Sequence, residues 1–326
     1  MSRGVFHHAA GLTIEANVAI PALPAAVTSR PPDIQIHVDS RPSWANDPFG
    51  TLHTSPFITA QGAPVVIVRH TAAGFHFDYA DGTDVWMDDT GGEIWCTNAP
   101  GATLADTATY LTGPILGFAL RRRGALALHA SAVVVQSRAL LMVGPHGSGK
   151  STTAAAFTAR DHDLITDDVT HLRRDDGGWV AERYPTGIRL WPDAAAFVVG
   201  EGVHLPRITP TWEKRVLHVT DRGDRQLPRA VPVGFIVFLD ERVDGADAPR
   251  LTAVGGAEAV VRLATHSSAS HLLDERARAD EFAELGALVK RVACVRAVPS
   301  ADPHRLPALV DMLVRWSADV LVPHAS

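Results

Sequence analysis

The stretch GPHGSGKST, residues 144–152, matches the pattern G-x-x-x-x-G-K-[ST], with Gly144, Gly149, Lys150 and Ser151 at its fixed positions. Glycines allow backbone N–H groups to converge on a polyphosphate, and the positive end of a following helix faces the same anion. The apolar run ALLMVG before the motif predicts a strand, and TTAAAF after it predicts a helix. The sequence therefore predicts an α/β protein in which this strand–loop–helix unit binds phosphate groups.

Lys150 and Ser151 give this loop its chemistry. In loops of this kind the lysine reaches the β- and γ-phosphates, and the hydroxyl group that follows it ligates Mg²⁺. ATP and Mg²⁺ are therefore the expected cofactors. His146 occupies a variable position of the motif and is expected to point to solvent. The residues expected to hold the nucleotide are Gly144, Gly147, Ser148, Gly149, Lys150, Ser151 and Thr152.

A pair of carboxylates follows the loop in the segment DLITDD, residues 163–168. The apolar residues in this segment predict a short strand that delivers Asp167 and Asp168 at its C-terminal end. If this strand runs parallel to the strand before the loop, both carboxylates lie at the sheet edge that binds the phosphates. We expect Asp168 to hold Mg²⁺ together with Ser151, and Asp167 to accept the proton of an attacking hydroxyl group, although the two roles could be reversed.

His129 in LALHASAV begins a predicted strand beside the loop strand, so its imidazole could approach the two aspartates. The alternative is a structural histidine at the start of a strand. With Asp167, Asp168 and Lys150, it completes the set of candidate catalytic residues.

Three further basic residues could contact phosphate. Arg189 in ERYPTGIRLWPD could meet the triphosphate or form a surface salt bridge. Lys214 and Arg215 in WEKRVLHV could close over ATP, or they could lie on a solvated strand edge.

Composition excludes several classes of function. The chain has 326 residues, of which 46% are hydrophobic and 20% charged, as in an ordinary globular protein. Its net charge of −6 offers no basic surface for nucleic acid or an anionic membrane, and the run at 121–123 is expected to end a helix. Cys96 and Cys294 form no metal or redox motif, and neither a signal peptide nor a membrane span is expected. These features predict a cytoplasmic protein.

The hydrophobic pattern divides the chain into three parts. Residues 1–101 are predicted to form a β-rich domain, with alternation in DIQIHV, a hairpin turn at Asp81-Gly82 and a loop over 42–56. Residues 102–123 are predicted to form a helix that bridges two domains, and residues 124–326 to form the catalytic domain. Further strands are predicted at 127–135, 231–240 and 292–298, and helices near 257–265, 276–291 and 305–320.

The order of these segments resembles the HPr serine kinase/phosphorylase superfamily. The resemblance rests on His129 in LHASAV, on GPHGSGKST, on DLITDD and on YPTGIRLWPD, and it covers roughly residues 124–320. It implies a P-loop kinase core of the HPr kinase and phosphoenolpyruvate carboxykinase type. It further implies that Asp167 and Asp168 are the catalytic and metal-linked pair, with His129 beside them. The chain is most similar to the branch found in bacterial biosynthetic gene clusters, including kinases that phosphorylate a serine of lasso-peptide precursors.

Two family signatures differ in this chain. YPTGIRLW replaces the Glu-Arg-Gly-type signature after the aspartates, with Glu182 as the nearest candidate for its metal-ligand glutamate. The Arg-rich loop on the C-terminal side of the core is absent from the sequence. Recognition of HPr and the phosphorylase reaction are therefore not carried over from the resemblance.

The sequence favours an ATP-dependent serine kinase that acts on a peptide or a small protein. A homo-oligomer is also expected, because members of the family often form one. Two alternatives stay open: a nucleotide switch that hydrolyses ATP without transfer, and a kinase of a small hydroxylated metabolite. An adjacent aspartate pair favours transfer, because a switch has less use for a positioned base.

Overall fold

The computed structural model describes residues 4–184, 187–200, 202–219, 228–245 and 247–321. The chain forms a mixed α/β structure in two compact units, and each contains segments from distant parts of the sequence. The N-terminal unit comprises Met1–Ala125, Ile208–Trp212 and Ala269–Asp274, and the C-terminal unit comprises Leu126–Arg207, Glu213–Ser268 and Glu275–Ser326.

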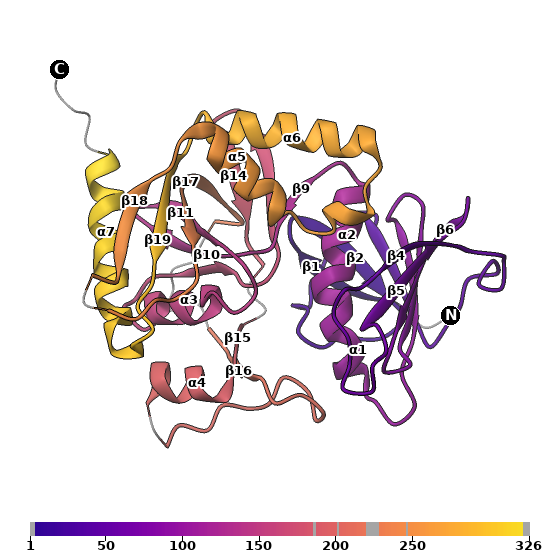
Figure 1. Cartoon of the computed structure of the whole chain (residues 1–326). Coiled ribbons are helices and arrows are strands. Elements are labelled where there is room, and N and C mark those ends of the chain that lie inside the picture. The colour runs from indigo at the N-terminus through magenta and orange to yellow at the C-terminus, as the bar shows by residue number, and fades with distance from the viewer. Residues whose placement is uncertain (1–3, 185–186, 201, 220–227, 246, 322–326) are drawn as a thin grey trace. The chain divides into compact units, whose positions relative to one another are not determined.

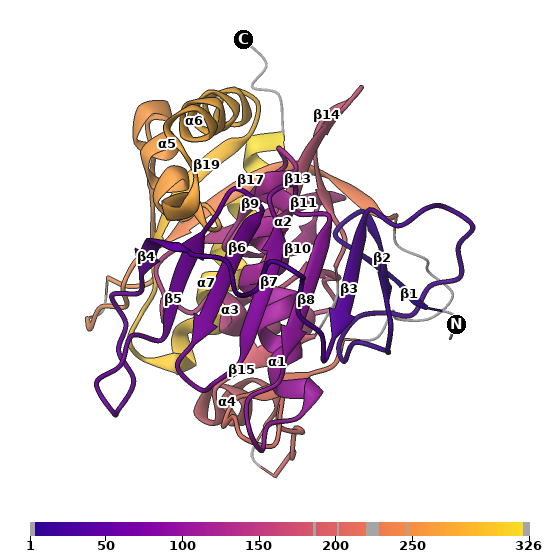
Figure 2. The same cartoon turned by 90° about the vertical axis from the view of Figure 1, so that its right-hand side faces the viewer.

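The N-terminal unit is built on an eight-stranded sheet in the order β1-β2-β3-β8-β7-β6-β5-β4, which Figure 2 shows face-on. Strand β3 pairs in parallel with both of its neighbours, and the other pairs are antiparallel. The predicted alternation in DIQIHV is confirmed, because Ile34, Ile36 and Val38 are buried. The strands are β1 Val5–Ala9, β2 Leu12–Ala16, β3 Ile34–Val38, β4 Gly50–Thr54, β5 Val66–His70, β6 Gly74–Tyr79, β7 Asp84–Asp88 and β8 Glu93–Thr97.

A helical segment packs on this sheet through an aromatic cluster. It runs as α1 Leu104–Tyr110, a π-helical turn η1 Leu111–Ile115 and α2 Leu116–Arg122. Phe118 lies fully buried against Phe75, with ring centroids 4.8 Å apart. The predicted helix end is confirmed: α2 is capped by Arg123, and Gly124 follows with φ +76°. This helical segment, predicted as a bridge, belongs to the N-terminal unit.

Two segments from later in the chain complete the N-terminal unit. In the first, Thr211 donates a hydrogen bond to the buried carboxylate of Asp106, and Trp212 packs edge-on against Tyr110. In the second, the 3-10 turn η2, Ser270–Leu272, places the His271 ring 4.1 Å from that of His53 on β4. The N-terminal unit therefore needs residues from beyond position 125 as well as the sheet itself.

The prediction of a loop over residues 42–56 is wrong in part, because strand β4 lies within it at the sheet edge. The side chains of Thr51 and Leu52 are exposed, so no buried face imposes a hydrophobic alternation on this strand. Backbone pairing with β5 defines the strand, and that pairing leaves no local signal in the sequence.

The C-terminal unit contains a nine-stranded sheet in the order β12-β10-β11-β17-β14-β13-β9, with β19 also beside β17 and β18 beside β19. Strands β11, β17 and β19 are parallel to one another. The strands of this sheet are β9 Leu126–Leu128, β10 Ala130–Val135, β11 Arg138–Val143, β12 Leu164–Thr166, β13 Thr170–Asp175, β14 Gly178–Glu182, β17 Ala230–Leu239, β18 Arg250–Ala253 and β19 Ala293–Val298. A separate two-stranded sheet pairs β15 Ile188–Leu190 with β16 Arg215–Leu217.

Helices cover both faces of this larger sheet (Figure 1). Buried residues of α5 Gly256–Thr265 and α6 Glu275–Val289 pack with one face of the central strands. Residues of α3 Lys150–Thr158, α4 Pro192–Val199 and α7 Leu306–Leu321 pack with the other, and a short turn η3 Pro303–Arg305 precedes α7. The three helices predicted in the last third of the chain are confirmed. No helix in the described part of the chain is long and apolar enough to cross a membrane.

The strand predicted over residues 127–135 is wrong as a single element, because it breaks at His129. Its first part, β9, pairs with β13, whereas its second part, β10, pairs with β11 and β12. His129 donates its backbone N–H to the carbonyl of His266 at this break. His129 therefore lies between β9 and β10, directly before the first residue of β10, the strand that pairs with β11.

Strands β11 and β12 run in the same direction, as the prediction required, but they are not adjacent. Strand β10 lies between them and is antiparallel to both. Helix α3 connects the end of β11 to the start of β12, so the C-terminal ends of both strands reach the same sheet edge.

Candidate functional site

The segment GPHGSGKST forms the turn between β11 and α3. Gly147 and Gly149 adopt left-handed backbone angles, with φ +82° and +97°, which glycine tolerates without steric cost. A β-carbon at Gly144 would lie only 2.3 Å from the Leu239 carbonyl oxygen at the end of β17. The glycines therefore permit both the curvature of the loop and its close approach to the neighbouring strand.

Lys150 begins α3 and is almost fully buried, with 7% of its surface exposed. Its Nζ atom donates hydrogen bonds of 2.8 Å to the Gly144 carbonyl and 3.0 Å to the Pro145 carbonyl. Burial lowers the pKa of Lys150, although the negative charges of Asp168 and Asp167 oppose that shift. The ammonium group is thus held inside the curve of its own loop, where the negative charges of the two aspartates act on it.

Asp167 is the carboxylate that joins the loop to the sheet. Its Oδ1 atom accepts hydrogen bonds from Ser151 Oγ at 2.9 Å and from Ser131 Oγ at 2.5 Å. Its Oδ2 atom accepts one from the backbone N–H of Arg189 at 3.0 Å. With 3% of its surface exposed, the side chain is fixed from three directions by α3, β10 and β15.

Asp168, the next residue, has different partners. Its Oδ1 atom lies 3.1 Å from His129 Nδ1, and its Oδ2 atom accepts a 3.3 Å hydrogen bond from Arg189 Nη1. Burial by itself would raise the pKa of Asp168. The hydrogen bond to His129 and the positive charges of His129, Arg189 and Lys214 outweigh burial, so the pKa is held well below its usual range.

The backbone of Asp168 has φ +84°, a conformation that non-glycine residues adopt rarely. Strained backbone of this kind is found where surrounding contacts fix it, often at functional sites. Here the left-handed turn separates two consecutive carboxylates, so that Asp167 faces Ser151 while Asp168 faces His129.

These oxygen atoms suit a hard cation. Mg²⁺ is usually held by one or two carboxylates together with substrate phosphates and waters. The Asp167 carboxylate and the Ser151 hydroxyl, already in contact, supply such a donor set next to the loop. Within the described ranges, no three His, Cys, Asp or Glu side chains cluster as a complete metal site. The fit is therefore to a metal bound together with phosphate.

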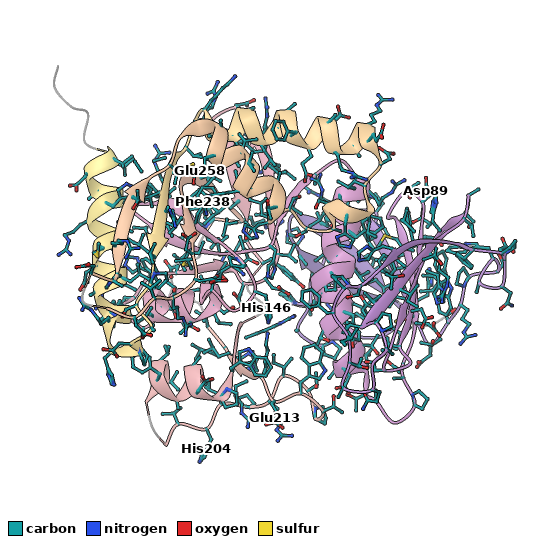
Figure 3. All side chains as sticks on the ribbon, viewed as in Figure 1. Asp89, His146, His204, Glu213, Phe238 and Glu258 are labelled. Atoms are coloured by element: carbon teal, nitrogen blue, oxygen red, sulfur yellow. The ribbon has the colours of Figure 1, made fainter. Side chains whose placement is uncertain are left out.

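Other predicted residues fall into two groups. His146, labelled in Figure 3, is exposed on the loop as predicted. Its pKa is lowered by partial burial and by the positive charges of Lys214 and Lys150. Arg189 reaches the aspartates through both its backbone and its side chain, and Lys214 lies over the Trp191 ring at 5.2 Å.

Glu182 and Arg215 are engaged elsewhere. Glu182, on β14, is buried and paired with Arg173 on the adjacent strand. Arg215 lies 3.9 Å from Glu213. Pro185 and Thr186 of the predicted YPTGIRLWPD segment lie outside the described residues.

Sequence reasoning missed Ser131 and Arg242. Ser131 lies two residues after His129, and the period-two geometry of a strand places both on the same side, which was an available signal. Arg242 follows β17, and its Nη2 atom would lie 2.9 Å from a β-carbon at Gly149. Among the described residues, no acidic side chain pairs with Arg242, so its guanidinium is available at the rim of the loop.

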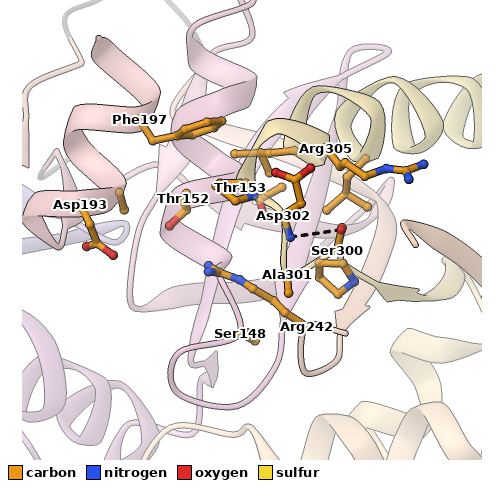
Figure 4. A pocket seen from close by; sticks show the side chains of 16 residues that line it. Ser148, Thr152, Thr153, Asp193, Phe197, Arg242, Ser300, Ala301, Asp302 and Arg305 are labelled. Carbon is orange, nitrogen blue, oxygen red and sulfur yellow. Dashed lines mark hydrogen bonds between the residues drawn. The ribbon is translucent and has the colours of Figure 1, made fainter. Parts of the chain in front are cut away.

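A pocket of about 290 Å³ opens beside the loop in the C-terminal unit. Figure 4 shows Asp193 on one side of Thr152 and Asp302 on the other, with Arg242 close to Ser148. Asp167 and Asp168 do not line this pocket, so the pocket lies on another side of the loop from the two aspartates.

Together these features define an α/β protein with a strand–glycine loop–helix turn and a carboxylate pair at one sheet edge. Among solved structures, the chain is similar to the HPr(Ser) kinase/phosphatase from Coxiella burnetii, with 14% sequence identity and a TM-score of 0.29. That match covers 60% of this chain and 97% of the other. No protein-family model matches the chain, and no curated protein matches it in sequence.

Proposed function

We propose that this protein is an ATP-dependent kinase that transfers the γ-phosphoryl group to a serine hydroxyl of a peptide or small protein. The observation that carries the proposal is the division between two consecutive carboxylates. Asp167 is bonded to Ser151 of the loop, whereas Asp168 faces His129 and Arg189. Phosphoryl transfer needs one group at the metal and another at the attacking hydroxyl, and these two positions meet that need.

In this proposal Asp167 binds the metal and Asp168 acts as the base, which is the reverse of the first expectation from the sequence. Asp167 and Ser151 would hold Mg²⁺, which when bound neutralises charge on the β- and γ-phosphates. Asp168 would accept the acceptor's proton on a carboxylate oxygen as the serine oxygen bonds to the γ-phosphorus. The bond from that phosphorus to the bridging oxygen breaks, and ADP leaves.

The surrounding cations would act on the phosphates and on the base. Lys150 would exchange its bonds to the loop carbonyls for bonds to the β- and γ-phosphates. His129 would orient Asp168 through the contact at Oδ1. The low pKa of Asp168 keeps its carboxylate ionised near neutral pH, so the side chain is in its proton-accepting form there, although it is a weak base.

The serine acceptor is supported by the resemblance of the segment order to HPr-kinase-like proteins, and the test is direct. The purified protein is incubated with labelled ATP and serine-containing peptides, including those encoded beside its gene, and phosphate is located by mass spectrometry. Transfer to serine that is lost in Asp168→Asn supports the proposal. ATP hydrolysis without any phosphorylated peptide would instead indicate the nucleotide switch, and phosphate on a small hydroxylated compound would indicate a metabolite kinase.

A further inference from the structure

One face of the two-stranded sheet β15–β16 contacts the proposed base, Asp168. The side chains of Ile188 and Leu190 are buried in the core, whereas Arg189 and Trp191 lie on the other face. Arg189 contacts Asp168 through its side chain. Two residues of extended chain cover about 6–7 Å, so Trp191 follows Arg189 on the same face at that spacing.

Lys214 is the cross-strand neighbour of Trp191. The register of β15 with β16 pairs Leu190 with Arg215, so Trp191 and Lys214 form the next pair. The Lys214 ammonium lies 5.2 Å from the centre of the Trp191 ring, in a cation–π arrangement. It is close enough to the base for its positive charge to act on Asp168. Trp191 therefore holds an ammonium group beside the position where the acceptor reacts.

This ammonium group is available to a negatively charged ligand. Within the described ranges, no acidic side chain forms an ion pair with Lys214. The neighbouring cations differ, because Arg189 is paired with Asp168 and Arg215 lies near Glu213. An uncompensated cation beside the base favours an acceptor that carries a negative charge.

A peptide that reaches Asp168 can also touch this pair. The attacking and leaving oxygens lie roughly in line through the phosphorus, so the acceptor approaches opposite to the bridging oxygen. The Asp168 side chain is 28% exposed and Trp191 is 51% exposed, so both are accessible to a peptide. Aromatic residues are enriched where proteins contact their partners. The face with Trp191 and Lys214 therefore suits the acceptor better than the donor.

We propose that Lys214 binds a carboxylate side chain of the acceptor peptide, an Asp or Glu close to the serine, and that Trp191 acts as a positioning residue for Lys214. An extended peptide covers about 3.3 Å per residue, so the acidic residue is expected within about three residues of the serine. The inference rests on the proposed function, because it requires that Asp168 receives a serine hydroxyl. It defines the substrate class as acidic serine peptides.

The test uses pairs of acetylated and amidated peptides that differ only by Asp or Asn at one position near the serine. The ratio of kcat/KM within each pair is measured with the full chain at saturating Mg·ATP. The wild type is expected to prefer the best Asp peptide roughly five- to thirtyfold, between the values for exposed ion pairs and for buried hydrogen bonds to charged groups. Asn peptides with a free C-terminus form a second arm. A preference for these over every internal Asp would overturn the assignment to a side chain.

Four variants locate the preference. Lys214→Met is expected to bring the Asp-to-Asn ratio close to one. Lys214→Glu is expected to make peptides with Lys at the same position the better substrates, a reversal that a folding defect would not produce. Trp191→Ala should reduce the ratio, whereas Trp191→Phe, which retains an aromatic face, should keep most of it. Lys290→Met removes an exposed lysine directly after α6 and is the matched control, with the wild-type ratio expected.

The outcomes separate this inference from the proposed function. Equal kcat/KM for Asp and Asn peptides in the wild type would overturn the inference and leave the serine kinase standing. So would an unchanged ratio in Lys214→Met, and if that variant also lost ATP affinity, Lys214 would be assigned to the donor. If the wild type hydrolyses ATP but phosphorylates no peptide, the proposed function falls and the inference falls with it.

Discussion

Ser151 Oγ donates a 2.9 Å hydrogen bond to Asp167 Oδ1, linking the first turn of α3 to the residue that follows β12. Replacing Asp167 with Asn keeps an oxygen acceptor for Ser151 and Ser131, but it removes the acceptor of the Arg189 N–H and the charge that would hold Mg²⁺. We expect Asp167→Asn to remain folded and to lose the gain in ATP affinity that Mg²⁺ provides to the wild type. Calorimetric titration of ATP with and without Mg²⁺ measures this difference. A variant whose ATP affinity still rises with Mg²⁺ would remove Asp167 from the metal site.

Asp168→Asn is expected to reduce phosphoryl transfer and not the binding of Mg·ATP. Because Asp168 contacts His129 and Arg189, its replacement should leave Mg·ATP binding nearly intact. Transfer to the peptide should fall about 10²- to 10⁴-fold, the usual contribution of a positioned general base. Single-turnover phosphorylation at saturating ATP separates this effect from binding. Unchanged transfer in Asp168→Asn, with loss in Asp167→Asn, would restore the first assignment of the two roles.

Arg242→Gln is expected to weaken the binding of ATP and of inorganic tripolyphosphate to a similar extent. The guanidinium lies against Gly149, and a hydrogen bond to a charged group contributes about 1.5–3 kcal/mol, or roughly a ten- to hundredfold change in affinity. Both affinities can be measured by calorimetry. Loss of ATP affinity alone would indicate that Arg242 acts on the nucleoside and not on the phosphates.

Gly144→Ala is expected to disrupt the loop. Its added β-carbon would lie 2.3 Å from the Leu239 carbonyl oxygen, and overpacking of this kind costs about 1–3 kcal/mol. A lower free energy of unfolding in chemical denaturation and loss of ATP binding are the expected results. Gly286→Ala is the control, because no atom lies within 4 Å of the added carbon and alanine in a helix interior stabilises by about 0.5–1 kcal/mol.

The N-terminal unit should lose stability in acid through His271. Burial lowers the pKa of His271 from 6.5 to about 4, and the neighbouring His53 adds to the shift. Since the folded state binds the proton less tightly than the unfolded state, the stability is complete above pH 6.5 and declines as the pH falls towards 4. His271→Gln should show a smaller decline in melting temperature over that interval. An identical decline in wild type and variant would assign the acid sensitivity to other groups.

The sequence was sufficient to predict the phosphate loop and the strand before Asp167. It was not sufficient to predict which distant residues contact them. The turn at residues 144–152 and the strand before Asp167 carry short-range patterns, because glycine, lysine and consecutive apolar residues act within a few positions. The different surroundings of Asp167 and Asp168 depend on a left-handed backbone angle at Asp168, which no neighbouring residue encodes. Arg242 reaches the loop only because β17 lies beside β11, a pairing across about ninety residues.

The same limit applies to the fold. Buried strands such as β3 were predicted from their alternation, whereas the exposed edge strand β4 was not. The break at His129 arises because β9 and β10 pair with different strands, although the apolar run through them is almost continuous. Long-range backbone pairing, which is common to both cases, leaves no trace in the spacing of neighbouring side chains.

The composite origin of the N-terminal unit restricts how this protein could exchange parts with others. Residues 208–212 and 269–274 return to that unit from within the C-terminal half of the chain, and Thr211 and His271 are among their contact residues. A recombination event that cut the gene after residue 125 would carry away the sheet without the two segments that complete it. The two halves of the chain are therefore expected to be inherited together, because neither half encodes a complete unit by itself.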